Sequence, residues 1–196
     1  MAMGLFPSAK KRRACFLRAT TGKVILDIGC GRRKLPGAIG VDRRHVSFAS
    51  DQEQRDIDHD LLSFPYPFPE NFADAIHCSH VLEHLPPTNK VIEECYRLLK
   101  PNGLLFIECP HFSWVEAYRH YEHCHFFTAG SFSYFHPANE VYHARFVQVW
   151  SEIFFDDFTY VIGVGFLGKF CQRLYERHLA FIFPANVFQV LLRAVK

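Results

Sequence analysis

The sequence predicts an α/β fold in which helices cover a mostly parallel sheet. Four short apolar runs, at residues 23–28, 38–41, 73–79 and 103–108, have the length and composition of strands buried on both faces. Between the last two runs, apolar residues recur at helical spacing, preceded by two prolines and followed by a Pro-Asn-Gly stop. This strand–helix–strand order favours a right-handed crossover between parallel strands.

The second half of the chain has a different pattern, typical of antiparallel strands joined by a helix. Residues 144–157 alternate between apolar and polar side chains, which indicates a strand with one solvated face. Residues 168–179 are predicted to form a helix, and residues 187–196 a final strand. The length of 196 residues suits one domain, and no repeat or long linker divides it.

The composition is that of a globular protein with ample material for a core. Hydrophobic residues make up 49% of the chain, aromatic residues 16%, and the net charge is only +2. The seven cysteines are spaced singly, which favours free thiols in a reducing, cytoplasmic environment over a zinc ribbon. No apolar stretch reaches the roughly 18 residues of a spanning helix, so we expect a soluble protein without a membrane partner.

The start of the chain is basic. Six Lys and Arg residues precede the first acid, Asp27. An organellar transit peptide has this composition, but a solvated basic helix beside the domain is the simpler interpretation. We therefore predict a helical basic segment over residues 1–22 and a single domain over residues 23–196.

A glycine turn joins the first two predicted strands. Gly29, Cys30 and Gly31 follow the strand that carries Asp27, and the next apolar run ends at Asp42. The backbone N–H groups of such a turn bind nucleotide-like ligands. The sequence therefore predicts a cofactor site at this edge of the sheet.

The charges around the turn distinguish two cofactor classes. Dinucleotide sites have a third glycine, where this chain has Lys34, and Asp27 would repel their pyrophosphate. S-adenosylmethionine (SAM) has no phosphate, and it carries an ammonium and a sulfonium group that Asp27 would attract. Asp42 fits as the acceptor for both ribose hydroxyls. SAM is therefore favoured, with a dinucleotide oxidoreductase as a rival.

Two longer motifs follow, at residues 56–85 and 91–112. They read DIDHDLLSFPYPFPENFADAIHCSHVLEHL and VIEECYRLLKPNGLLFIECPHF. Together with the turn, they resemble class I SAM-dependent methyltransferases of the small-molecule, methyltransferase type 11-like branch, in a compact subgroup. The resemblance implies a Rossmann-like doubly wound sheet of about seven strands, the last one antiparallel. Since few residues separate the first two strands, the helix between them is expected to be short or absent.

The resemblance also implies roles for individual residues. Asp60, after the third strand, would meet the adenine amino group beside the backbone of Leu61, although it could instead only cap a turn. Ser79 and His80 would pass the methionine end of the cofactor. The predicted cofactor-binding residues are thus Asp27, Gly29, Cys30, Gly31, Asp42, Asp60, Leu61, Ser79 and His80. Because the first helix is short, Arg32, Arg33, Lys34 or the N-terminal segment would cover one side of the cofactor.

Histidines follow the fourth and fifth predicted strands, where ligands gather in sheets of this topology. Methyl transfer mainly needs positioning, and it needs a base only when the nucleophile keeps a proton. His80, His111 and His123 are the candidate catalytic bases, and an aromatic-rich acceptor site or lid is expected at about residues 111–143.

Two other interpretations of the histidines remain open. His120, His123 and His125 have the spacing of metal ligands on a strand, but no carboxylate motif accompanies them, and we expect no resident metal. Alternatively the histidines are satisfied polar groups, with His84 capping its helix.

These patterns predict a SAM-dependent methyltransferase that acts on an oxygen or nitrogen of a small-molecule metabolite or biosynthetic intermediate. Nucleic acid is not an expected partner, because HCSH follows the fourth strand where DNA amino-methyltransferases carry N/D-P-P-Y. The order Cys109-Pro110 is also the reverse of the Pro-Cys motif of enzymes that attack ring carbons. A degenerate homologue that serves as a non-catalytic partner subunit is the alternative, and the aromatic-rich second half could supply a homodimer surface.

Overall fold

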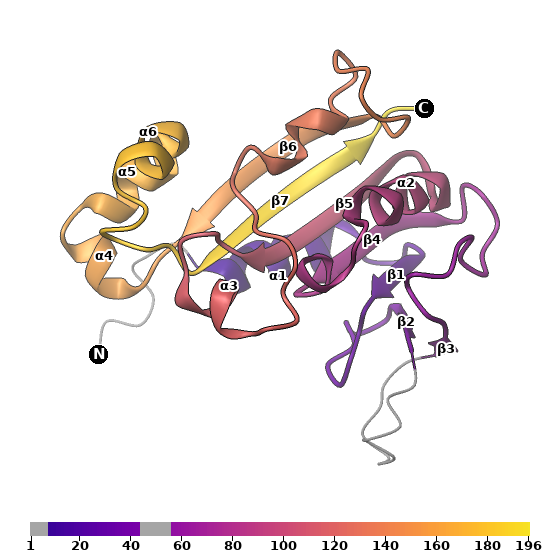
Figure 1. Ribbon diagram of the computed structural model, residues 1–196. Helices are drawn as coiled ribbons and strands as arrows, with labels where there is room; N and C mark the ends of the chain where they lie inside the picture. Colours follow the sequence, from indigo (N-terminus) through magenta and orange to yellow (C-terminus); the bar gives the residue numbers. More distant parts are fainter. Residues whose placement is uncertain (1–7, 44–55) are drawn as a thin grey trace.

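The computed structural model describes residues 8–43 and 56–196, and its seven strands form one mixed sheet (Figure 1). The strand order is β3-β2-β1-β4-β5-β7-β6. The strands are β1 (Ile25–Ile28), β2 (Ile39–Asp42), β3 (Ile57–Asp58), β4 (Ala73–Ser79), β5 (Leu99–Pro110), β6 (Phe146–Phe154) and β7 (Val187–Ala194). This arrangement confirms the predicted Rossmann-like α/β class.

The sheet is parallel in its first part and antiparallel in its last. β1 pairs in parallel with both β2 and β4, and β4 pairs in parallel with β5. All four residues of β1 are buried, as expected for a strand covered on both faces. The last strand, β7, inserts antiparallel between β5 and β6, which confirms the predicted position of the C-terminal strand.

Six α-helices and two 3-10 helices connect the described strands. The helices are α1 (Ala9–Ala19), α2 (Thr88–Leu98), α3 (Val115–Arg119), α4 (Asp157–Val161), α5 (Val164–Phe170), α6 (Gln172–His178), η2 (Leu82–His84) and η3 (Ser131–Phe135). The single helix predicted over residues 168–179 is wrong, because the chain leaves helical geometry at Cys171 (φ −131°, ψ 59°) and divides into α5 and α6. None of the helices in the described ranges has the length and apolar character needed to cross a bilayer.

The connection between β1 and β2 contains no helix in residues 29–38, all of which are described, and this confirms the expected short or absent element. The basic helix α1 covers the sheet at this point instead. Phe16 of α1 packs on Phe106 of β5 at 5.1 Å between ring centroids, and Leu35 from the β1–β2 connection joins the same buried cluster. Residues 1–7 of the predicted basic segment lie outside the described residues.

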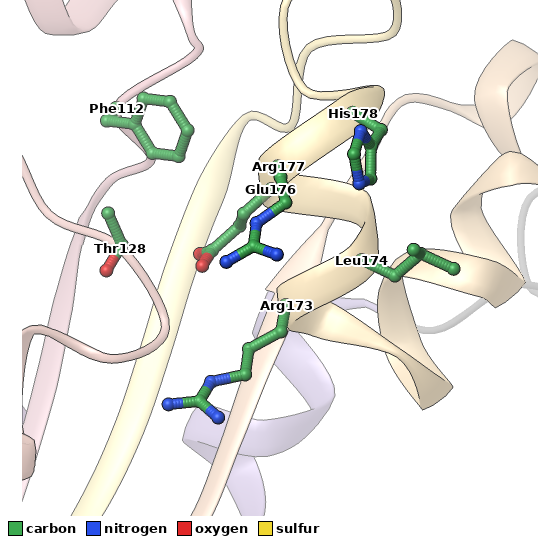
Figure 2. A pocket seen from close by; sticks show the side chains of 7 residues that line it. All are labelled: Phe112, Thr128, Arg173, Leu174, Glu176, Arg177 and His178. Carbon is green, nitrogen blue, oxygen red and sulfur yellow. The ribbon is translucent and has the colours of Figure 1, made fainter.

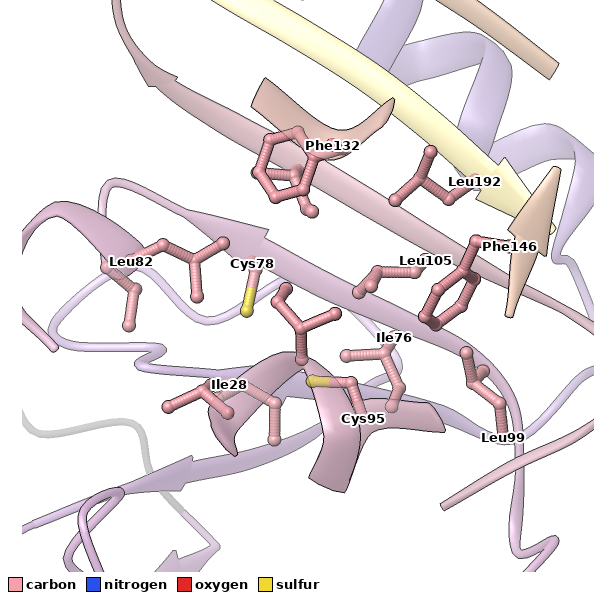
Figure 3. Close-up of a cluster of buried hydrophobic side chains, with 14 of the residues drawn as sticks. Ile28, Ile76, Cys78, Leu82, Cys95, Leu99, Leu105, Phe132, Phe146 and Leu192 are labelled. Atoms are coloured by element: carbon pink, nitrogen blue, oxygen red, sulfur yellow. The ribbon is translucent and has the colours of Figure 1, made fainter. Parts of the chain in front are cut away.

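The main core lies on the opposite face of the sheet, under α2 (Figure 3). Ile76 and Leu105 belong to this cluster, while their strand neighbours Ala75 and Phe106 belong to the α1 cluster. Because successive strand residues point to opposite faces, α1 and α2 cover the two sides of the sheet. Phe132 of η3 also packs into the main core, so this part of the expected lid region is fixed to the sheet by a buried side chain.

Replacing Phe16 by alanine should test whether α1 is part of the domain. Phe16 is only 3% exposed, so Phe16→Ala should lower the free energy of unfolding by about 3–5 kcal/mol. The matched control is Phe170→Ala, since Phe170 is 78% exposed. Urea unfolding that gave both variants the same small change would contradict the packing of α1 on the sheet.

Candidate cofactor and active site

A cavity of about 440 Å³ opens beside the carboxyl ends of β1, β2 and β4. Its lining residues are Gly29, Gly31, Asp42, Arg43, Asp60, Leu61, Leu62, His80, Val81, His84, Leu85, His120 and Glu122. Six of the nine predicted cofactor-binding residues are among them, and they come from four separate segments of the chain. The remaining three, Asp27, Cys30 and Ser79, are not on the wall.

The glycine turn forms one wall of the cavity and is held by close contacts. Gly29 has a φ of +69°, and a Cβ atom at this position would lie 2.3 Å from Cγ2 of Val81. Its N–H donates a hydrogen bond to the carbonyl of Val41 at 2.8 Å. A side chain at position 29 would therefore push the turn away from Val81.

Asp42 and Asp60 place carboxylates on the same cavity. Oδ2 of Asp42 accepts a hydrogen bond from the N–H of Gly31 at 2.8 Å, so this side chain also holds the turn. Oδ1 of Asp60 accepts from the N–H of Leu62 at 2.9 Å. Asp60 thus caps a turn and lines the cavity at the same time, and the two interpretations of this residue do not exclude each other.

Asp27 differs from the expectation that it meets the cofactor ammonium. The residue is 3% exposed, and its oxygens accept hydrogen bonds from the N–H of Leu35 and from Nδ1 of His77, both at 2.6 Å. No helix follows the glycine turn, and the connection instead brings the backbone N–H of Leu35 to the Asp27 carboxylate at the end of β1. We therefore propose that Asp27 is structural.

Three further residues named in the sequence analysis, Cys30, Ser79 and Lys34, have defined surroundings within the protein. Burial and the nearby Asp42 raise the pKa of Cys30 to about 12, so the thiol stays neutral. Oγ of Ser79 donates to Oε1 of Glu108 at 3.0 Å. Nζ of Lys34 lies 2.8 Å from Oδ2 of Asp56, which directs it into an ion pair instead of over the cavity.

His80 lies on the cavity wall between two glutamates. Nε2 is 3.3 Å from Oε1 of Glu108, and Nδ1 is 3.4 Å from Oε1 of Glu83. Its backbone has a φ of +56°, a conformation that a non-glycine residue rarely adopts without support. Hydrogen bonding to Glu108 and then Glu83 raises the pKa of His80 to about 9. An imidazole that is protonated at pH 7 has no lone pair to accept a proton, so this environment does not suit the predicted base.

Glu108 has the complementary shift. Although burial raises its pKa, hydrogen bonds from His80, Gln189 and Ser79 lower it to about 2 overall. Glu108 is therefore ionised at every pH at which the protein is expected to work.

His111 lies away from this cavity. It is fully buried, with Nδ1 2.8 Å from Oγ of Ser113 and Nε2 3.2 Å from Oε1 of Glu176. The structure gives it no access to a ligand in the glycine-turn cavity, because both ring nitrogens are occupied within the protein.

Glu176 belongs to a second, larger cavity of about 730 Å³ between α6 and the loop that carries Thr128. Figure 2 shows its carboxylate pointing from α6 towards Phe112 and Thr128, with Arg173 and Arg177 on the same side of the helix. The N–H of Ala129 donates to this carboxylate at 2.6 Å. Glu176 thus ties α6 to the expected lid region.

His123 lies beside two other histidines, His84 and His120, that line the glycine-turn cavity. Its ring centroid is 4.5 Å from that of His84 and 5.1 Å from that of His120. Residues 123–126 do not form the strand that the metal-site alternative with His120, His123 and His125 required. His84, for which a helix cap is the alternative interpretation, is the third member of this histidine cluster.

The comparison with known proteins identifies the family. The sequence model described as a methyltransferase domain matches residues 6–139. The chain belongs to this family. The resemblance recognised in the sequence is thereby confirmed.

Curated relatives of this methyltransferase-family chain include two ubiquinone biosynthesis O-methyltransferases. The one from Pseudomonas putida (strain W619) is 35% identical over 103 residues, and the one from Pseudomonas entomophila (strain L48) is 34% identical over 103 residues. The matched region covers 43% of this chain and 43% of each relative's length.

Solved structures share the fold across nearly the whole chain. A SAM-dependent methyltransferase from Archaeoglobus fulgidus has a TM-score of 0.65 at 20% identity, over 94% of this chain and 92% of its own. The YcgJ protein of Bacillus subtilis has a TM-score of 0.59 at 16% identity, over 95% of this chain and 98% of its own. At such low identity these likenesses support the fold alone.

The structural role of Asp27 can be tested by Asp27→Asn. Losing the charge on a buried acceptor of two hydrogen bonds should lower the free energy of unfolding by about 1.5–3 kcal/mol. Asp157→Asn is the matched control, because Asp157 is exposed. If Asp27→Asn instead kept its stability and only weakened ligand binding, the original expectation of an ammonium contact would be right.

The charge state of His80 gives a second test, by NMR titration of its imidazole. We expect a midpoint near pH 9, against an ordinary 6.5, and a lower midpoint in Glu108→Gln. Because the folded pKa is raised, the stabilising ion pairs are fully present below about pH 6.5 and are lost as the pH rises through about 9. The ring is half-exposed, so this contribution is about 1 kcal/mol. A midpoint near 6.5 in the unsubstituted protein would contradict the assignment.

Proposed function

We propose that this chain binds SAM in the 440 Å³ cavity and transfers the methyl group to an oxygen of a small-molecule acceptor. The observation that carries the proposal is the convergence of the glycine turn, Asp42 and Asp60 on one cavity at the carboxyl ends of parallel strands. Ligands of doubly wound sheets bind at this edge.

The lining residues suggest how the cofactor would lie. The Asp42 carboxylate would accept hydrogen bonds from the ribose hydroxyls, and Asp60 would accept one from the adenine amino group. The methionine end would then extend towards His80. Glu83 and Glu108 flank the His80 imidazolium and are not among the cavity-lining residues, so its positive charge is paired within the protein.

The protein's main contribution to methyl transfer would be positioning. A hydroxyl oxygen of the acceptor attacks the methyl carbon in line, the carbon–sulfur bond breaks with its electrons going to sulfur, and the hydroxyl proton passes to water. The products are a methyl ether, a neutral thioether and a hydrated proton. In this arrangement His80 stays protonated because its pKa is raised, and its two ring nitrogens lie against Glu108 and Glu83. His80 would therefore be a fixed, internally paired group of the cavity wall and not a base.

Oxygen is favoured over nitrogen as the methylated atom because the curated relatives are O-methyltransferases. Residues 111–143 would form the acceptor side, since His120 and Glu122 from this region line the cavity. The alternative of a non-catalytic partner subunit has no supporting feature in the described part of the chain. A homodimer and a cytoplasmic location stay predictions.

Isothermal titration with S-adenosylhomocysteine tests the cofactor assignment. We expect micromolar binding by the unsubstituted protein and no binding of NAD. Asp42→Ala should weaken S-adenosylhomocysteine binding about 10- to 100-fold, since it removes charged acceptors of two ribose hydrogen bonds.

Asp157→Ala serves as the control for Asp42→Ala, because Asp157 is exposed and does not line the cavity. Circular dichroism must show that each variant is folded. Absence of S-adenosylhomocysteine binding by the folded, unsubstituted protein would refute the proposal, and binding of NAD in its place would favour the dinucleotide rival.

A further inference from the structure

The three histidines at the cavity edge form a cluster that cofactor binding does not require. His84 belongs to η2, while His120 and His123 follow α3. One ring nitrogen from each lies within 4.8 Å of the other two. We propose that this His84–His120–His123 cluster binds a divalent transition-metal ion of the zinc type.

The hydrogen bond of His123 prepares its ring for metal binding. Nδ1 of His123 is 3.0 Å from the carbonyl oxygen of Ala117. A carbonyl oxygen can only accept, so in the neutral ring Nδ1 carries the proton and Nε2 keeps its lone pair. Metal-binding histidines commonly donate their second ring nitrogen in this way, which fixes the tautomer and the ring orientation.

The geometry needs only small side-chain movements. Zn–N bonds of about 2.0–2.1 Å place tetrahedral donor atoms roughly 3.3 Å apart, closer than the 4.8 Å limit that encloses the three nitrogens here. His120 is exposed and His84 and His123 are half-buried, so the rings can turn inwards without opening the core.

The ligand set favours zinc or a similar ion over magnesium or calcium. Three neutral imidazoles without a carboxylate suit Zn²⁺, Co²⁺ or Ni²⁺, whereas Mg²⁺ and Ca²⁺ prefer oxygen ligands. Three protein ligands also leave a fourth tetrahedral position open, as in catalytic zinc sites.

The open position would face the cofactor cavity. His84 and His120 both line that cavity, together with Glu122. A hydroxyl or phenol oxygen of the acceptor could bind there and be held near the methyl donor. This role rests on the proposed function, whereas the metal site itself does not.

Cobalt titration of the tag-free, metal-stripped full chain tests the site. We expect one equivalent of Co²⁺ to produce the visible absorption of four-coordinate cobalt, and one equivalent of Zn²⁺ to abolish it. His84→Gln and His120→Gln should each weaken Zn²⁺ binding by about 100-fold or more, since each removes one of three ligands. His136→Gln, a change at an exposed histidine outside the cluster, should bind as the unsubstituted protein does.

Two outcomes would overturn the metal site. The first is a folded protein that binds no Co²⁺, in which case the histidines only pack against each other. The second is Zn²⁺ binding that is unchanged in His84→Gln and His120→Gln, which would place the ion elsewhere. Parallel titration with S-adenosylhomocysteine separates this result from the proposed function, because cofactor binding without metal binding refutes the site alone.

Discussion

The buried carboxylate of Asp27 is the constraint on which the glycine-turn side of the molecule depends. A charged group that is 3% exposed is costly unless it is paired, and here the N–H of Leu35 and the ring of His77 pair it. These contacts hold the β1–β2 connection, which contains no helix, against β1 and β4. The side chain of Leu35 packs in the buried cluster on this face of the sheet, and Phe16 of α1 belongs to the same cluster (Figure 1).

The position of this connection determines the shape of the cavity. Gly29 can approach Val81 only because it has no side chain, and this contact interlocks the glycine turn with the segment after β4. The next residue back along the chain is His80, whose left-handed backbone is held by its N–H bond to the carbonyl of Glu108 at 2.8 Å. The glycine-turn side of the cavity is thus built from backbone segments that hold each other in place, whereas His120 and Glu122 on the cavity wall come from the loop after α3.

The sheet is predicted well because each strand is marked by the pattern of its own consecutive residues. Buried apolar runs mark the parallel strands, and the alternating pattern marks the antiparallel pair. The break at Cys171 is missed because no glycine or proline marks it. The internal partners of Asp27 and His111 cannot be foreseen for another reason: His77 and Glu176 lie 50 and 65 residues away in sequence. From their charge and position in the sequence, Asp27 and His111 are expected to contact a ligand. Their hydrogen-bond partners within the protein become visible only in the folded structure. The histidine cluster likewise joins η2 to a distant loop.

His80 and His84 both line the cavity, and their different surroundings shift their pKa values in opposite directions. His80 and His84 are four residues apart and begin with the same intrinsic pKa. Hydrogen bonds to Glu108 and Glu83 raise the pKa of His80 to about 9, whereas burial lowers the pKa of His84. These shifts favour the charged form of His80 and the neutral form of His84. Pairs of groups whose environments push their pKa values apart take different roles in one site. The wall thus has a charged, internally paired ring at His80 and, a short distance along it, a ring at His84 whose nitrogen can bind a proton or a metal ion.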